Sequence, residues 1–332
     1  MRSLLLFLLL AAPVLAAAED GIVRGRVVNG SGGPLLEAVE FRLASFGEKG
    51  GVWPVEDGGE GFLFEGLPTG EENPFLVHAS YLGVVYNSRF HLHPGEDTTI
   101  VFEVYDTTSA GAGIRVEEME IDLSLIEDRI RLDEVFRVVN ETSPPRTVVG
   151  AGGTFRVFLP VPVGAVPDLV LAASRGIMPV RRDPIPAESE NEAALDYPMR
   201  PGTTAVAASF ELPYAGGFSF DARVPYDIPR LLVVAPADML LEGEGLAPAH
   251  DGGEGVGVFS MEGIAAGDRI RFRASGGSPP SSSPAAEGMP PGRVVTGAPP
   301  FAGIRLPLIA LMGLFLFAAL GLALRPPSRR VR

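Results

Sequence analysis

The sequence predicts an all-β protein, with two tandem antiparallel β-sandwich domains followed by one C-terminal transmembrane helix. Three observations lead to this prediction. Apolar and polar residues alternate in short runs between turn residues, which is the pattern of half-buried strands. No segment between the N-terminal apolar run and Leu306 keeps a helical period. A long uncharged run then begins at Leu306.

The C-terminal run, Leu306 to Leu324, has the length of a membrane span. Its 19 residues carry no charge, and at about 1.5 Å per residue they extend roughly 28 Å, close to the hydrocarbon thickness of a bilayer. Four arginines follow the run and only Arg305 precedes it, so the C-terminal side is expected to be cytoplasmic. We predict a transmembrane helix over 304–324 and a basic cytoplasmic tail over 325–332. The alternatives are a buried core helix and a processed sorting signal.

The N-terminus agrees with this topology. Arg2 precedes an apolar segment from Leu4 to Leu15, and Ala16–Ala18 supplies small residues for cleavage. Residues 1–18 therefore read as a secretory signal peptide, with an uncleaved anchor as the alternative. The domains between the two apolar segments are expected to lie outside the cytoplasm.

Charge and composition limit the partners. The chain has a formal net charge of −14, and all 41 acidic residues lie between Glu19 and Glu287, so its surface is expected to repel nucleic acid. Cysteine is absent, which excludes disulfides and thiolate metal sites. Arginine almost entirely replaces lysine, which occurs only at Lys49. This bias is typical of a GC-rich bacterial genome, so we expect a location in the bacterial inner membrane, with the N-terminal domains periplasmic or extracellular.

The first domain, 19–108, contains short alternating runs separated by Gly, Pro and Asn. The expected strands are Ile22–Val28, Ala38–Leu43, Gly61–Leu67, Phe75–Tyr81 and Thr99–Tyr105. Glycines lie where the turns favour a positive φ, for example Gly33 and Gly66.

Several motifs of this domain belong together. They are Gly25-x-Val27, Gly33-Pro34-Leu35 with Ala38-Val39 and Leu43, and Gly61-Phe62-x-Phe64-x-Gly66-Leu67-Pro68-x-Gly70. This part of the chain resembles the carboxypeptidase regulatory-like domain. The resemblance implies a transthyretin-like β-sandwich of about seven strands with a binding or spacer role and no catalytic residues. The segment Glu71–Pro74 departs from the family pattern and suggests a longer loop.

The second domain, 109–275, is expected to be another sandwich, immunoglobulin-like in shape only. Residues 184–195 are acidic and lack an apolar period, so we expect an exposed loop there. Residues 276–303 are rich in Ser, Pro and Gly and predict a semi-rigid stalk. The expected strands are Ile114–Leu123, Arg129–Val139, Phe155–Val161, Leu169–Ala173, Ala205–Leu212, Phe218–Val224, Arg230–Val234, Val256–Ser260 and Asp268–Arg273.

Two tyrosines are the first candidates for ligand binding. Tyr81 and Tyr86 could present a flat aromatic face to a sugar or a peptide. The alternative interpretation is that both rings close the sandwich core and keep their hydroxyls at its rim.

A weak metal candidate follows these tyrosines. His93 and Glu96 match the H-x-x-E pair that zinc carboxypeptidases use, and His91 lies on the same face of a strand as His93. A zinc hydrolase also needs a third ligand and a general base, and His93-Pro94-Gly95-Glu96 also has the composition of a hairpin turn. We therefore expect no metal, no other cofactor and no catalytic residue.

The function expected from the sequence is that of a non-enzymatic, membrane-anchored binding or scaffolding protein. It would present its β-sandwich domains to a protein partner in the cell envelope, as an accessory subunit of an envelope complex. The alternative is a surface protein that binds carbohydrate or another envelope polymer, with Tyr81 and Tyr86 as its site.

Overall fold

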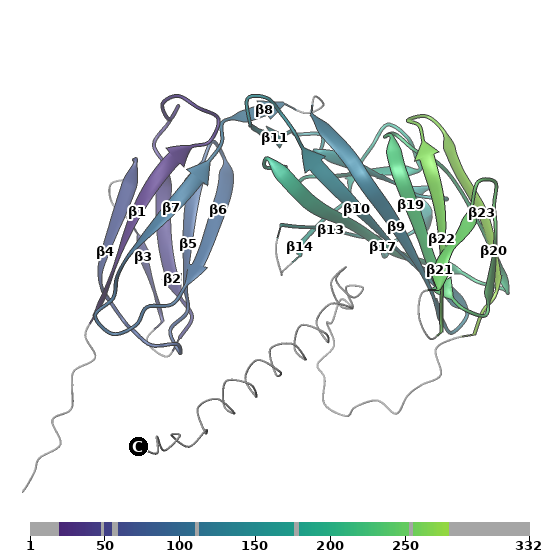
Figure 1. The fold of residues 1–332 in the computed structure, drawn as a ribbon, viewed down its shortest axis with the longest axis horizontal. Helices are drawn as coiled ribbons and strands as arrows, with labels where there is room; N and C mark the ends of the chain where they lie inside the picture. The colour runs from purple at the N-terminus through teal and green to yellow at the C-terminus, as the bar shows by residue number, and fades with distance from the viewer. Residues whose placement is uncertain are drawn as a thin grey trace, which may run out of the picture. The chain divides into compact units, whose positions relative to one another are not determined.

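The computed structural model describes residues 20–47, 50–54, 59–109, 113–175, 179–251 and 255–278, all within one compact unit, Met1–Ser281. In these ranges the chain forms β-strands and one short 3-10 turn, η1 (Val163–Ala165), without an α-helix. The all-β prediction is therefore confirmed (Figure 1). The predicted signal peptide, the transmembrane helix over 304–324, the tail and nearly all of the stalk lie outside the described residues.

Within the described ranges, no helix has the length and apolar character that crossing a membrane requires.

The N-terminal half contains two sheets. The first has the order β4-β1-β7, and the second has the order β3-β2-β5-β6. Their strands are β1 (Gly21–Asn29), β4 (Gly61–Leu67), β7 (Asp97–Val104), β2 (Glu40–Ser45), β3 (Gly51–Pro54), β5 (Phe75–Tyr81) and β6 (Val84–Phe90).

Apolar side chains from both sheets share one core. Alternate residues of β5 are fully buried, as the period-two pattern predicts. Phe41 and Phe62 pack with their ring centroids 4.6 Å apart, and Phe102 of β7 lies 5.9 Å from Phe41. These contacts join strands of the two sheets across the core.

The prediction of purely antiparallel sheets is wrong in detail. β1 pairs with β7 in parallel, for example Val27 with Phe102, and β19 (Ile228–Pro236) pairs with β9 (Ile114–Ile126) in parallel. Most other pairs are antiparallel. Alternation reveals that a segment is a strand, but the direction of pairing depends on which distant strand it meets.

The C-terminal half is built on an eight-stranded sheet with the order β14-β13-β17-β10-β9-β19-β22-β21. Its remaining strands are β10 (Arg129–Asn140), β13 (Val170–Ser174), β14 (Val180–Arg182), β17 (Gly202–Pro213), β21 (Ala247–Asp251) and β22 (Val256–Ile264).

Two three-stranded sheets share their core with this large sheet. Phe136 of the large sheet packs edge-on against Phe155 and Phe158, at centroid distances of 5.3 and 5.6 Å. The two sheets are β12-β16-β15 and β18-β23-β20, formed by β12 (Phe155–Phe158), β15 (Ile185–Pro186), β16 (Glu192–Leu195), β18 (Gly217–Arg223), β20 (Met239–Glu242) and β23 (Arg269–Gly276).

Residues 184–195, expected to be an exposed loop, contain β15 and β16 instead. Ala193, Ala194 and Leu195 of β16 are buried, because this strand lies between β12 and β15. A strand that is buried on both faces shows no alternation, so the pattern gave no signal for it.

A small parallel pair connects the two halves. β8 (Thr107–Ser109) pairs with β11 (Thr147–Val149), and the Ser31 hydroxyl donates a 2.5 Å hydrogen bond to the carbonyl of Pro145. The backbone N–H of Asp106 donates to the same Ser31 oxygen at 2.9 Å. The two cores are therefore joined by hydrogen bonds as well as by the chain.

Candidate functional site: an apolar cleft with an acidic end

The tyrosines predicted to bind a ligand are buried. Tyr81 is 0% exposed, and its hydroxyl donates to Asp106 Oδ1 at 2.7 Å and accepts from the backbone N–H of Leu36 at 3.0 Å. This burial, with the nearby Asp106 carboxylate, raises the pKa of Tyr81. Tyr86 is 4% exposed. Neither ring offers the open face that stacking on a sugar needs, and both have the core-closing position of the alternative interpretation.

The histidine candidates lie on a turn. His91 and His93 are exposed, and the Glu96 carboxylate accepts a 2.7 Å hydrogen bond from the backbone N–H of His93. The N–H of Glu96 in turn donates to the carbonyl of His93 at 3.0 Å, and Gly95 has a φ of +71°. The Glu96 carboxylate therefore closes a turn, and among the described residues no group of three metal-ligating side chains is found.

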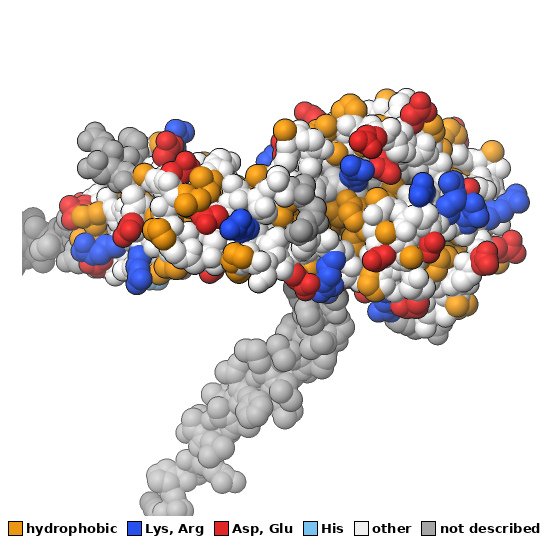
Figure 2. Space-filling model, turned by 90° about the horizontal axis from the view of Figure 1, so that it is seen from above, with side chains coloured by type: hydrophobic (Ala, Val, Ile, Leu, Met, Phe, Trp, Pro, Cys, Tyr) orange, Lys and Arg blue, Asp and Glu red, His pale blue; other side chains and the backbone are white. Residues whose placement is uncertain are grey.

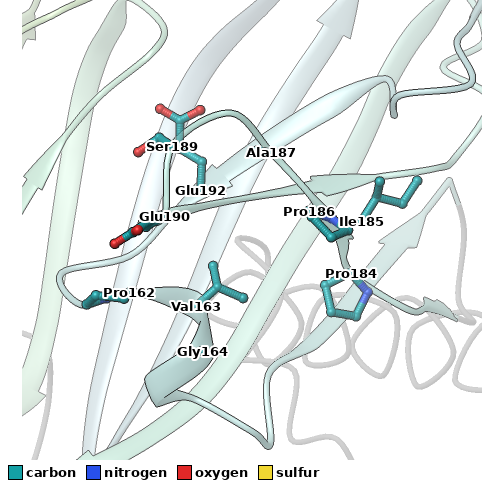
Figure 3. Close-up of a pocket in the computed structure, with 10 residues that line it drawn as sticks. All are labelled: Pro162, Val163, Gly164, Pro184, Ile185, Pro186, Ala187, Ser189, Glu190 and Glu192. Atoms are coloured by element: carbon teal, nitrogen blue, oxygen red, sulfur yellow. The ribbon is translucent and has the colours of Figure 1, made fainter.

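A cleft of about 530 Å³ lies in the second half of the chain. One wall is the segment Pro162–Gly164, which contains the N-cap and the first residues of η1, and the other is the segment Pro184–Ala187, which contains β15. Figure 3 shows the rings of Pro184 and Pro186 on one side and the carboxylates of Glu190 and Glu192 at the opposite end. The cleft is mostly apolar, with negative charge at one end.

Backbone hydrogen bonds hold both walls. The N–H of Val163 donates to the carbonyl of Glu190 at 2.7 Å, and the N–H of Leu159 donates to the carbonyl of Asn191 at 2.8 Å. The opposite wall is fixed because Ile185 of β15 pairs with Ala194 of β16. The cleft is thus formed by structured elements before any ligand enters, which lowers the entropy lost on binding.

The two carboxylates at the acidic end differ. Glu192 is largely buried, with 16% of its side chain exposed, and lies 3.6 Å from the guanidinium of Arg156. Glu190 is exposed and forms no ion pair within the described ranges. Glu190 is therefore the carboxylate that is available to a cation entering the cleft.

Prolines limit how a ligand can bind here. β15 is the edge of its sheet, and an edge strand normally pairs with a further strand. Pro184 and Pro186 have no N–H to donate, so continuous strand addition at this edge is blocked. A ligand must use side-chain contacts inside the cleft.

Sequence reasoning missed this site. Its residues fall in a segment that was predicted to be a loop and in a turn that carries no catalytic motif. One signal was available in the sequence: the two prolines of Pro184-Ile185-Pro186 favour the edge strand of a sheet, where no further strand pairs.

Acidic and basic side chains are interspersed over the face shown in Figure 2, so the net negative charge of the chain does not gather there in one patch.

No protein-family model matches the sequence, and no curated protein matches it. Among solved structures, the chain is similar to an M1 zinc metallopeptidase from Deinococcus radiodurans, with 14% identity and a TM-score of 0.29 over 50% of this chain and 43% of that chain. A variant of the enzyme from this organism bound to a Tyr-Ser-Ala substrate gives 16% identity and a TM-score of 0.30, over 58% of this chain and 52% of that chain. The chain thus covers about half the length of these peptidases.

The sequence-based prediction of a non-enzymatic protein is contradicted by these neighbours, which are peptidases, and it is not kept. A likeness with a TM-score of 0.29 assigns no activity to the chain and gives none of its residues a catalytic role.

Proposed function

We propose that the chain is an exported single-pass membrane protein whose β-sandwich domains bind a partner protein in the bacterial cell envelope. In this proposal residues 1–18 are a signal peptide, 276–303 a stalk and 304–324 the membrane anchor, with the tail in the cytoplasm. The first domain would be a carboxypeptidase regulatory-like sandwich and the second an immunoglobulin-like one. The sharing of one core by two or more sheets in each half supports both assignments.

The observation that carries the binding role is the preformed cleft between Pro162–Gly164 and Pro184–Ala187. Its apolar walls fit hydrophobic side chains, and Glu190 lies where a cationic side chain would be attracted. The partner would insert an extended segment that carries an apolar residue followed by Lys or Arg. No comparable observation favours carbohydrate, because Tyr81 and Tyr86 are buried.

Two substitutions test the cleft in the full-length protein. A Cβ added to Gly164 meets no atom within 4 Å, so Gly164→Trp can add a bulky ring to the cleft lining without a clash at its Cβ. Glu190→Lys reverses the available charge. Each has a matched control outside the cleft lining: Gly152→Trp, whose Cβ also meets nothing within 4 Å, and Glu188→Lys, which is exposed on the same loop.

The measurement is a pull-down in mild detergent from native membranes, followed by mass spectrometry. We expect a stoichiometric protein partner with the wild type and both controls, and at least a tenfold loss of it with Gly164→Trp and Glu190→Lys. Recovery of the wild-type protein alone would contradict the binding role. Equal recovery of the partner with all variants would show that the partner binds elsewhere.

A further inference from the structure

Two arginines meet at one end of the large sheet. Arg175 follows β13 and Arg200 precedes β17, and these strands pair so that Ser174 lies opposite Ala205. Arg175 Nη2 donates a 2.8 Å hydrogen bond to the carbonyl of Pro201, the residue after Arg200. The antiparallel pairing therefore brings the two arginines to the same end of the sheet, where the charge of Arg200 acts on Arg175.

Arg200 is held on an aromatic ring. Its Cζ lies 5.1 Å from the ring centroid of Tyr86, a distance typical of a cation–π contact. The ring is fixed in turn, because the Tyr86 hydroxyl lies 3.1 Å from Thr147 Oγ1 and accepts from the N–H of Tyr105 at 3.0 Å. Arg200 is thus oriented before any ligand arrives.

Neither positive charge is neutralised by a carboxylate of the described residues. Neither Arg175 nor Arg200 takes part in an ion pair formed by the described residues. Partial burial and then the charge of Arg200 lower the pKa of Arg175, whose other electrostatic neighbours are Tyr197, Tyr105 and Tyr86. An anion at this position would relieve the repulsion between the guanidinium groups.

We propose that Arg175 and Arg200 form a binding site for a doubly charged oxyanion, namely phosphate or a phosphate monoester. Two guanidinium groups carry two positive charges, and each presents N–H donors in one plane that can bind two oxygens of a phosphate group. A phosphate group carries about −1.5 to −2 charges at pH 7, so the charges balance. Arg175 reaches solvent and Arg200 is half-buried, so a ligand can approach. The net charge of −14 disfavours a long polyanion and favours a small ligand.

The site is separate from the cleft and is tested by itself, with inorganic phosphate as the probe. The full chain in zwitterionic detergent is unfolded by heat while phosphate replaces chloride at constant ionic strength. We expect a saturable rise of the unfolding midpoint by about 2 °C or more. Arg175→Gln and Arg200→Gln should each weaken the apparent affinity at least tenfold. Arg89→Gln, an exposed arginine on β6, serves as the control and should keep the wild-type response.

Three results would overturn the proposal. An equal rise in all variants would mean that phosphate acts by exclusion from the surface. An equal saturable rise with acetate would contradict the doubly charged ligand. A third result concerns the protein without phosphate. Arg175→Gln removes the repulsion by Arg200 and also the hydrogen bond to the Pro201 carbonyl, so its midpoint should fall by no more than about 4 °C. A larger fall, together with the loss of the phosphate response, would indicate a structural arginine. Arg175→Lys keeps the positive charge but loses the planar set of N–H donors, so this variant should bind phosphate with intermediate affinity.

Discussion

The hydroxyl of Tyr86 lies 3.1 Å from Oγ1 of Thr147, and this contact joins β6 of the N-terminal half to β11 of the C-terminal half. Thr147 is fully buried, and its N–H donates to the carbonyl of Asp106 at 2.9 Å. The two halves therefore meet at a buried, hydrogen-bonded contact. Such contacts are sensitive to the loss of one partner, because the remaining polar group stays unsatisfied.

Removing this hydroxyl should destabilise the chain. We expect Tyr86→Phe to lower the free energy of unfolding by about 1–3 kcal/mol, since both Thr147 Oγ1 and the N–H of Tyr105 lose a partner. Urea unfolding of the full chain in detergent measures this change. In a double-mutant cycle with Thr147→Val, the combined loss should be smaller than the sum of the single losses. Strict additivity would show that the two hydroxyls do not interact.

The buried carboxyl group of Glu134 should destabilise the folded protein. Its side chain is 0% exposed on the core face of β10, and neither carboxylate oxygen has a hydrogen-bond partner in the part of the chain that the structure describes. Burial raises its pKa well above the ordinary value. Replacement by Met, of similar length and apolar, should raise the free energy of unfolding by at least about 2 kcal/mol at pH 7. Glu65→Met, at an exposed position of β4, should change it by less than about 0.5 kcal/mol.

The pH dependence of the same variant gives a second test. With a raised pKa, the folded state holds a proton that the unfolded state has released, so stability falls as the pH rises above the ordinary pKa of a glutamate, about 4.3. This contribution is fully present below that pH. Glu134→Met should flatten the decline, and an unchanged pH profile would mean that Glu134 is ionised in the folded protein.

Asp122 should titrate close to neutral pH. Burial, then the carboxylates of Glu120 and Asp133, raise its pKa to about 7. Its protonated form therefore contributes stability that is present at pH 4 and lost as the pH rises to about 7. Carboxyl-carbon NMR titration should place its midpoint near 7. Asp221, whose pKa is lowered by Arg269 and Arg271, should titrate below the usual aspartate value in the same experiment. A midpoint near 4 for Asp122 would contradict the prediction.

Alternation along the chain was enough to place most strands. The nine runs predicted in the second half coincide with observed strands, for example β10 at Arg129–Asn140 and β17 at Gly202–Pro213. In β10 and β17 buried residues alternate with more exposed ones along most of the strand, so burial leaves a period of two in the sequence. β16 was missed because Ala193, Ala194 and Leu195 are all buried.

The candidate sites could not be predicted in the same way. The cleft combines two separate segments, Pro162–Gly164 and Pro184–Ala187. The first is held by the hydrogen bond from Val163 to Glu190, and the second by the pairing of β15 with β16. Arg175 and Arg200 meet through the pairing of β13 with β17. No local pattern records which distant segments will meet. Tyr81 and Tyr86 show the converse, since an aromatic pair in a strand pattern has the same sequence whether it is buried or exposed.

The parallel pairing of β9 with β19 also has a consequence for the order of folding. Leu231 lies opposite Met119, so more than a hundred residues must be synthesised before this pair can form. The β9–β10 hairpin is local and is complete much earlier. Loop closure over such a separation is slow relative to hairpin formation. During synthesis, therefore, β9 keeps one open edge until β19 arrives, and this interval is when the nascent chain is most exposed to pairing with the wrong strand.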